Sequence, residues 1–483
     1  MLNFNFNKMK RIIIILSLIA VLTSCSKDLE KLNVNIKDAT AAGGETFFAY
    51  AEKEMAGAMS DLTYGSSGTP WTICRFFAQQ ISANTYNEGS NYFAQFNWTS
   101  VYMNVLKNLD ESRRNIEAVS PLTDAATKQK QNQLAIIEVM NVYTYTRLVE
   151  SFGNIPYKEA LVIDNVLPKY EDQKAVYTDL ISRLNAAIAK LDISGTSFGT
   201  SDLIYSGSVT NWKSFANSMK LQMGMRIIEA LPELGTTTVQ AAIPGVFTSN
   251  TLNAKLTFLT AQPNTNPLWV DLAVGNRQDF VAAAPLVDQM NAVADPRRAV
   301  YFTTVSGAFV GAPYGLPVEY SRYSHFGDLF YTPTVPSILL DYATVEFLLA
   351  EAVERAIPGA TGTAEQHYNA AITASFSYYG VSGIDTYLRL PQVAYQTATG
   401  PWKRKIGIQK WIALYNQGFE AWTEYRRLDY PELKAPVAAF INVVPKRLLY
   451  PTSEQTLNTA NWSAASSAIG GDLMTTKLFW DIN

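Results

Sequence analysis

Carboxylates and arginines at helical spacing are the residues of this chain best suited to chemistry. Glu351 lies four residues before Arg355 in "EFLLAEAVERA", and "QKWIALYNQGFEAWTEYRRL" carries Glu420, Glu424, Arg426 and Arg427. Two carboxyl groups about 5–9.5 Å apart across a cleft could hydrolyse a glycosidic bond. Oppositely charged residues three or four apart on a helix also pair with each other. We therefore interpret these groups as ion pairs between packed helices, and keep a glycosidase as the less favoured alternative.

Other catalytic patterns are weak. Gly195-Thr196-Ser197-Phe198-Gly199 fits the G-x-S-x-G pattern, but a nucleophile elbow needs a strand before it and a helix after it. Here a helical pattern precedes and a polar loop follows. The chain has two histidines, His325 and His367, and the sequence contains no P-loop or H-E-x-x-H pattern. We predict no catalytic residue, no metal site and no cofactor.

Asp295-Pro296-Arg297-Arg298 has a structural interpretation. Asp295 can cap a short helix that Pro296 begins. The two arginines can bind carboxylates or carbonyl oxygens.

Aromatic and polar side chains gather in three loop-like stretches, 82–97, 262–280 and 311–330. An aromatic ring offers a flat contact surface for a ligand, while Asn, Asp and Arg can satisfy its polar groups. Trp98, at a helix start, is interpreted as core. The candidate ligand-binding residues are Tyr86, Asn87, Asn91, Tyr92, Trp269, Asn276, Arg277, Asp279, Tyr314, Tyr320 and Tyr323.

Helical periodicity dominates the rest of the chain. Neighbouring helices joined by turns predict stacked helix-turn-helix units, as in a tetratricopeptide-like solenoid, and hence an all-α fold. Cys74, in "WTICRFFAQQ", is interpreted as a buried small hydrophobic residue. The expected helices cover about 45–61, 70–83, 98–119, 128–153, 172–191, 211–230, 281–292, 341–356, 363–379 and 403–427.

The N-terminus has the pattern of an export signal. Lys8, Lys10 and Arg11 precede the apolar run 12–22, which is shorter than the about 20 residues that span a bilayer. Met9 is an alternative start. The following "LTSC" resembles the lipobox of bacterial lipoproteins, in which the cysteine, here Cys25, becomes the lipidated first residue. Removing residues 1–24 moves the net charge from −3 to −6, which does not suit nucleic acid.

Several stretches in one order resemble the SusD/RagB family of outer-membrane lipoproteins. They include "FNWTSVYMNVLKNLDESRRNIEA", "RLVESFGNIPYKEAL", "LVDQMNAVADPRRAVYF", "DYATVEFLLAEAVERA" and "RLLYPTSEQTLN". In the fourth stretch, Thr344 and Val345 stand where the family more often has an acidic residue. The resemblance runs from the lipobox to near the C-terminus.

This resemblance implies about four tetratricopeptide-like units packed against a loop-rich half. It implies a signal peptide at 1–24 and a single domain at 25–483, with helical parts at about 40–230 and 338–483 and a loop-rich insert at about 235–337. The implied function is a lipid-anchored, outward-facing protein that binds oligosaccharides and delivers them to a SusC-like TonB-dependent transporter without catalysis. RagB-type members handle peptides, so a peptide ligand is the alternative.

Overall fold

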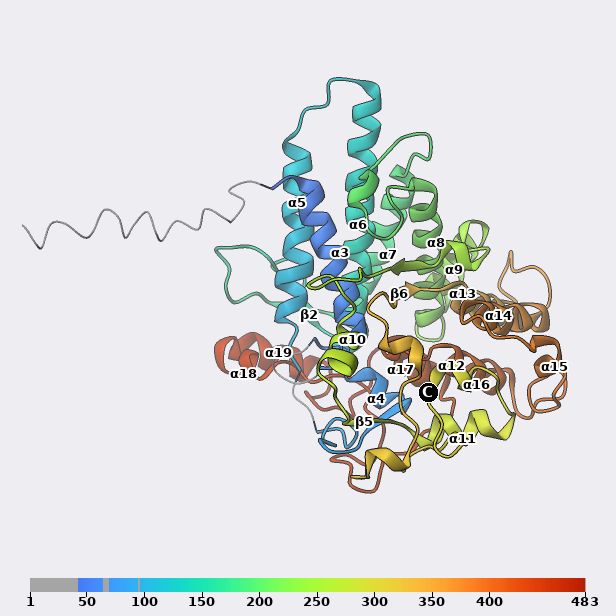
Figure 1. Ribbon diagram of the computed structural model, residues 1–483. Helices are drawn as coiled ribbons and strands as arrows, with labels where there is room; N and C mark the ends of the chain where they lie inside the picture. The colour runs from blue at the N-terminus through green and yellow to red at the C-terminus, as the bar shows by residue number, and fades with distance from the viewer. Residues whose placement is uncertain (1–41, 64–68, 94–95, 483) are drawn as a thin grey trace, which may run out of the picture. The chain divides into compact units, whose positions relative to one another are not determined.

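The computed structural model describes residues 42–63, 69–93 and 96–482 of the chain (Figure 1). The expected signal peptide, residues 1–24, and the expected lipidation site Cys25 lie outside the described residues. From Gly44 onward the described residues form one compact unit. Within these ranges, every helix is too short or too polar to cross a bilayer.

Helices hold 52% of the residues and strands 5%, so the predicted all-α class is confirmed. Shorter helices are α4 (Cys74–Phe77), α10 (Pro267–Trp269), α11 (Ala284–Ala292), α12 (Arg298–Tyr301), α15 (Ile384–Leu388), α18 (Thr452–Leu457) and α19 (Thr459–Ala468). The longer helices are α3 (Gly44–Ser60), α5 (Lys107–Ala118), α6 (Asp124–Phe152), α7 (Gln173–Lys190), α8 (Val209–Ile227), α9 (Pro232–Ala242), α13 (Tyr342–Glu354), α14 (Ala364–Tyr378), α16 (Trp402–Ala413) and α17 (Gly418–Leu428).

The long helices pack as neighbouring pairs. α6 lies along α7, α8 along α9, α13 along α14, and α16 along α17. Successive pairs touch through α7 and α8, α8 and α13, and α13 and α16. Figure 1 shows this succession passing from the cyan and green helices to the orange ones. Two of these pairs, α6 with α7 and α13 with α14, match neighbouring helices that the sequence predicts, whereas α9 is not predicted and α16 and α17 are predicted as one helix.

Side-chain caps fix where the helices begin. Thr123, Asp172, Ser208 and Asp341 each accept a hydrogen bond from a backbone N–H in the first turn of α6, α7, α8 and α13. Such a bond satisfies one of the N–H groups that a helix start leaves unpaired. Thr363 and Gln366 form a reciprocal capping box on α14. The helix starts are therefore set by local sequence.

Two predicted helices are wrong. Only α4 is helical within 70–83, because Gln79 has a φ of 51° and the chain then enters strand β1 (Ile81–Ala83). The single helix predicted at 403–427 is two helices, α16 and α17, and the turn between them contains Asn416 with a φ of 67°. That turn makes them one of the four helix pairs.

Two further predicted helices begin differently. The one at 98–119 starts as the π-helix η1 (Val101–Leu106) before α5. The one at 281–292 opens with strand β5 (Phe280–Ala282), and α11 starts only at Ala284.

Within the described ranges the strands form three antiparallel two-stranded sheets. β2 (Ile155–Pro156) pairs with β3 (Tyr170–Glu171), and β4 (Ala254–Leu256) pairs with β6 (Ser337–Leu340). β1 pairs with β5, with Ile81 opposite Ala282 and Ala83 opposite Phe280. This last sheet joins two of the loop regions in which the sequence places its candidate ligand residues.

The core confirms two interpretations from the sequence. Trp98 is 4% exposed, and its ring contacts Phe152 and Tyr450. Cys74 is fully buried, and burial raises the pKa of its thiol. A buried, protonated thiol behaves as a small hydrophobic side chain.

Candidate functional site

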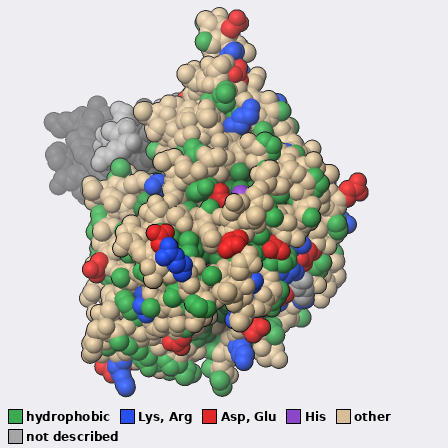
Figure 2. All heavy atoms as spheres, turned by 90° about the vertical axis from the view of Figure 1, so that its right-hand side faces the viewer, with side chains coloured by type: hydrophobic (Ala, Val, Ile, Leu, Met, Phe, Trp, Pro, Cys, Tyr) green, Lys and Arg blue, Asp and Glu red, His purple; other side chains and the backbone are tan. Residues whose placement is uncertain are grey.

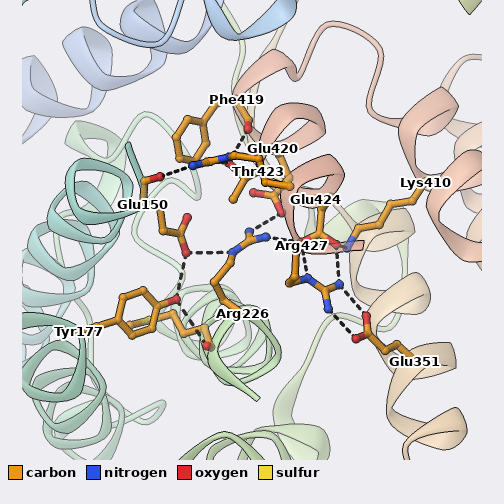
Figure 3. Close-up of polar contacts among 12 residues, drawn as sticks. Glu150, Tyr177, Arg226, Glu351, Lys410, Phe419, Glu420, Thr423, Glu424 and Arg427 are labelled. Carbon is orange, nitrogen blue, oxygen red and sulfur yellow. Dashed lines mark hydrogen bonds and ion pairs between the residues drawn. The ribbon is translucent and has the colours of Figure 1, made fainter. Parts of the chain in front are cut away.

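The charged groups with catalytic potential lie in the protein core (Figure 3). Arg226 of α8 pairs with Glu150 of α6 at 3.1 Å, with Glu420 of α17 at 2.9 Å, and with Glu424. Arg427 bonds both carboxylate oxygens of Glu351, at 2.5 and 2.6 Å. Glu424 also accepts from Lys410 at 2.7 Å and from Arg427 at 2.6 Å. Arg355 contacts Glu351 at 2.8 Å, as the spacing predicts.

These ion pairs are structural. Burial alone would raise the pKa values of Glu351 and Glu424, but the adjacent cations outweigh burial and lower both. Among the cations, Arg427 makes the largest contribution for each carboxylate. A carboxylate held ionised in the core cannot donate a proton to a sugar or contact it. The network instead ties the first helix pairs to α13, α16 and α17.

Arg426 does not pair with Glu420 or Glu424, which the spacing allowed. Its guanidinium lies 3.4 Å from the centre of the Trp422 ring and donates to the carbonyl oxygens of Glu150 and Lys446, both at 2.9 Å. Burial, its largest influence, lowers the pKa of Arg426 to about 9. Arg426 thus joins three chain segments through neutral acceptors.

The other two motifs are also structural. Asp295 accepts from the backbone N–H of Arg297 at 2.9 Å and from its guanidinium at 3.0 and 2.7 Å. The arginine therefore binds a carboxylate as predicted, although α12 begins only at Arg298. Ser197, of the G-x-S-x-G pattern, lies in a loop and donates to the carbonyl of Gly207 at 2.9 Å.

The three loop regions that the sequence singles out are joined around the β1–β5 sheet. Asn84, just after β1, accepts from the N–H of Val318 at 3.1 Å and donates its own N–H to the carbonyl of Asp279 at 3.2 Å. Its side-chain amide donates to the carbonyl of Gln278 at 3.1 Å. One residue of the first region therefore bonds both of the others.

Asn87 and Asn91 act as clamps between loops. Both side-chain amides donate to the carbonyl oxygen of Gly315, at 3.1 and 2.8 Å. Gly315 has a φ of 77°, which favours glycine, and its N–H donates to Ser82 at 3.1 Å. The two predicted ligand residues thus fix the third region against the first.

Two candidate tyrosines point inward. Tyr92 is fully buried, its hydroxyl accepts from Gln79 at 2.9 Å, and burial raises its pKa to about 12. Tyr314 is partly buried and donates to the carbonyl of Phe76 at 2.6 Å. Both hydroxyl groups are therefore engaged inside the protein, and the buried Tyr92 offers no open ring face.

Tyr320 and Arg277 are held in fixed positions. The Tyr320 ring is parallel to that of His325, with centroids 4.2 Å apart. Arg277 lies between Asp271, at 3.1 Å, and Asp279, at 2.6 Å. Burial lowers the pKa of Arg277, but its bonds to the two aspartates outweigh burial and raise it. The remaining candidates differ in exposure: Asn276 is exposed, Trp269 and Tyr323 are partly buried, and Asp279 is buried.

A fourth segment completes this surface, and the sequence analysis missed it. Residues 434–443 lie beside the first region, where Phe440 donates its N–H to the carbonyl of Asn91 at 2.8 Å. The rings of Phe93 and Phe440 are 5.5 Å apart, although both side chains are largely exposed. Pro436 contacts Gly315. The residue types around Phe440 gave no sign of this contact.

We use the term apolar patch for the exposed side chains of Tyr86, Phe93, Leu316, Val437 and Phe440; the rings of Phe93 and Phe440 are in contact, and the other three lie on the loop segments that Asn91 joins. Figure 1 draws the blue, orange and red-brown loops that carry them at the lower end of the view. In Figure 2, hydrophobic side chains gather along the lower edge, at the same level. Loops carried on a rigid scaffold often hold binding residues.

A cavity of about 520 Å³ lies between α3 and the start of the second loop region. Lys53, Glu54 and Asp61 line one side, and Gln262 and Asp271 line the other. Among the described residues, His, Cys, Asp and Glu do not form a group of three that could hold a metal ion.

Comparison with known proteins places this geometry in a family. Residues 41–451 match the family model described as "Starch-binding associating with outer membrane", which is SusD-like. Residues 9–26 match a prokaryotic membrane lipoprotein lipid attachment site. No curated protein matches the chain.

Solved structures give the same result. A chitin-binding protein is 26% identical, with 91% of this chain and 100% of the other covered and a TM-score of 0.76. A SusD homologue from Bacteroides uniformis is 25% identical, with 90% and 99% covered and a TM-score of 0.76. A chitin-binding SusD homologue from Flavobacterium johnsoniae is 24% identical, with 90% and 99% covered and a TM-score of 0.75. With the family model matching most of its length, the chain belongs to the SusD-like family of outer-membrane proteins.

Proposed function

We propose that this protein is a cell-surface lipoprotein that binds oligosaccharides on the loops around the β1–β5 sheet and passes them to a SusC-like TonB-dependent transporter. Family membership and the chitin-binding neighbours support the ligand class. The lipid attachment match supports acylation of Cys25, which would hold the protein on the outer face of the outer membrane. Anchoring through several acyl chains is stable, whereas one chain holds only marginally.

The observation that carries the proposal is the apolar patch on interlocked loops. Tyr86, Phe93 and Phe440 are each at least 60% exposed, and they lie on segments joined by hydrogen bonds through Asn91 and Gly315. Exposed aromatic rings can stack on the C–H faces of sugars. Loops already held in place lose little freedom on binding, which favours affinity.

Polar groups around the patch can serve sugar hydroxyls. Glu88, Asn276 and Glu319 are exposed on the same three regions, and Arg277 is fixed by its two aspartates. Hydroxyl groups that lose water need such partners, because an unpaired buried polar group costs about 1–3 kcal/mol. A surface of this kind can bind an oligosaccharide without a catalytic residue.

Calorimetric titration tests the ligand class. Chitin and starch oligosaccharides, and peptides of similar length, would be titrated into the mature chain. We expect binding of at least one oligosaccharide series, and chromatography should recover it intact. Binding of peptides alone would favour the RagB-like alternative. Reproducible cleavage that one carboxylate substitution abolishes would favour a glycosidase.

The transporter step is tested separately. A barrel encoded beside this chain should copurify with the lipoprotein, and Cys25→Ala should abolish fatty-acid labelling. Equal labelling of the wild type and the Cys25→Ala variant would contradict the proposed anchor.

A further inference from the structure

A second cavity, away from the apolar patch, combines two cations with neutral polar groups. It encloses about 320 Å³ between α11, α14, α16 and the loop that precedes α16. Arg404 and Lys405 line it together with Gln289, Gln392, Thr397 and Thr399, and apolar side chains complete the wall. Pockets of this size hold small molecules. Among the described residues that line the cavity, none is a carboxylate.

Both cations are held in place by neutral oxygens. Arg404 donates to the carbonyl and hydroxyl oxygens of Thr399, at 2.9 and 3.0 Å. Lys405 donates to the carbonyl of Tyr395 at 2.7 Å. In the described part of the chain, no carboxylate lies within 4.0 Å of either side-chain cation. Their positions are therefore fixed while their charges are left without an ionic partner.

Three acidic groups near the cavity have hydrogen-bond partners other than Arg404 and Lys405. Glu354 accepts from the Tyr395 hydroxyl at 2.6 Å, and Glu365 accepts from Gln396 at 2.9 Å. Asp295 bonds Arg297. The neighbouring cation Lys403, by contrast, pairs with Glu229 at 2.7 Å and is not among the lining residues. Positive charge at the cavity is thus a property of Arg404 and Lys405.

The local sequence adds a second argument. α16 begins "WKRK", with no acidic residue in its first turn, and Pro401 provides no side-chain cap. The start of a helix carries partial positive charge, so cations there are unfavourable. Residues that lower local stability, such as cations at a helix start, are expected mainly where function requires them.

We propose that this cavity binds a small hydroxylated carboxylate, of the size and chemistry of a sugar acid. The carboxylate would pair with Arg404 and Lys405 through charge-assisted hydrogen bonds. The amides of Gln289 and Gln392 and the hydroxyl of Thr397 can serve ligand hydroxyl groups. This cavity shares no lining residue with the apolar patch, so it is a separate site.

Titration calorimetry at constant ionic strength tests this, with D-glucuronate and D-galacturonate compared with D-glucose and D-galactose. These pairs differ by the carboxylate. We expect a uronate to bind on the order of tenfold more tightly than its neutral partner. Lys405→Gln and Arg404→Gln should remove that preference, whereas Lys403→Gln, which loses the same charge on the same helix turn, should retain it.

Melting curves of the three variants show whether each remains folded, and Lys405→Gln alone suffices if Arg404→Gln does not fold. The proposal is overturned if neither uronate is preferred over its neutral partner. It is also overturned if Lys403→Gln reduces the preference as much as Lys405→Gln does.

Discussion

The side-chain amide of Asn91 lies 2.8 Å from the carbonyl oxygen of Gly315, and this bond joins loops 224 residues apart in the chain. Asn87 reaches the same oxygen at 3.1 Å. On the other side of Asn91, its own carbonyl accepts from Phe440. One buried residue thus connects the three segments that carry the apolar patch.

Substituting Asn91 by alanine should loosen this surface. The lost hydrogen bond should lower the free energy of unfolding by about 1–2 kcal/mol, and glycan affinity should fall because the loops must then be ordered on binding. Urea unfolding and calorimetry measure the two effects. Asn461 also joins distant segments, through Leu167, so Asn461→Ala is a matched control that should bind normally. Unchanged affinity in Asn91→Ala would contradict the role of the clamp.

The exposed rings should affect binding rather than stability. Tyr86→Ala, Phe93→Ala and Phe440→Ala should each weaken glycan binding, by about tenfold for a ring that stacks on sugar. Their melting temperatures should stay close to that of the wild type. Trp411 and Phe347 are 2% and 0% exposed, so alanine there should cost about 3–5 kcal/mol of stability. Normal binding by all three patch variants would place the ligand elsewhere.

Removing a fully buried cation from the ion-pair network should lower the stability of the fold more than removing a partly exposed one. Arg427→Met would leave Glu351 and Glu424 short of a cation inside the core, which should cost about 3–5 kcal/mol. Arg355→Met is the control, because Arg355 is partly exposed and Glu351 keeps Arg427. Denaturant unfolding should show a much smaller loss for Arg355→Met, and equal losses would argue against the network.

Acid should destabilise the fold through the same carboxylates. The cations around them, above all Arg427, hold the pKa values of Glu351 and Glu424 below their ordinary range despite burial, and Arg297 does so for Asp295. In the unfolded chain the pKa values of these groups are about 4.3 for Glu and 3.9 for Asp. The unfolded chain therefore binds protons before the folded chain does as the pH falls. This stabilisation is complete above about pH 5 and is lost as the pH falls through the lower folded-state values. Melting temperatures measured between pH 7 and pH 3 should follow this course, and a constant value would contradict it.

Much of this arrangement could be predicted from the sequence, because helical periodicity and loop composition are local signals. They identified most of the long helices and the loop regions around Tyr86, Arg277 and Tyr320, but they missed α9 and merged α16 and α17 into one helix. They did not identify Phe440, because its contact with Asn91 is a backbone hydrogen bond, which does not depend on residue type. Arg226 was also missed, because α8 carries three cations and the sequence does not reveal that the partners of this one lie 76 and 194 residues away. The break at Gln79 depends on a left-handed backbone conformation that glutamine rarely signals.

The most direct test of the central claim is hydrogen–deuterium exchange of the mature protein with and without a saturating oligosaccharide. We predict slower exchange in the segments 84–93, 313–318 and 434–443, with little change in the paired helices α6 to α9. Protection confined to those helices, or none at all in the three loop segments while the oligosaccharide is bound, would contradict the account.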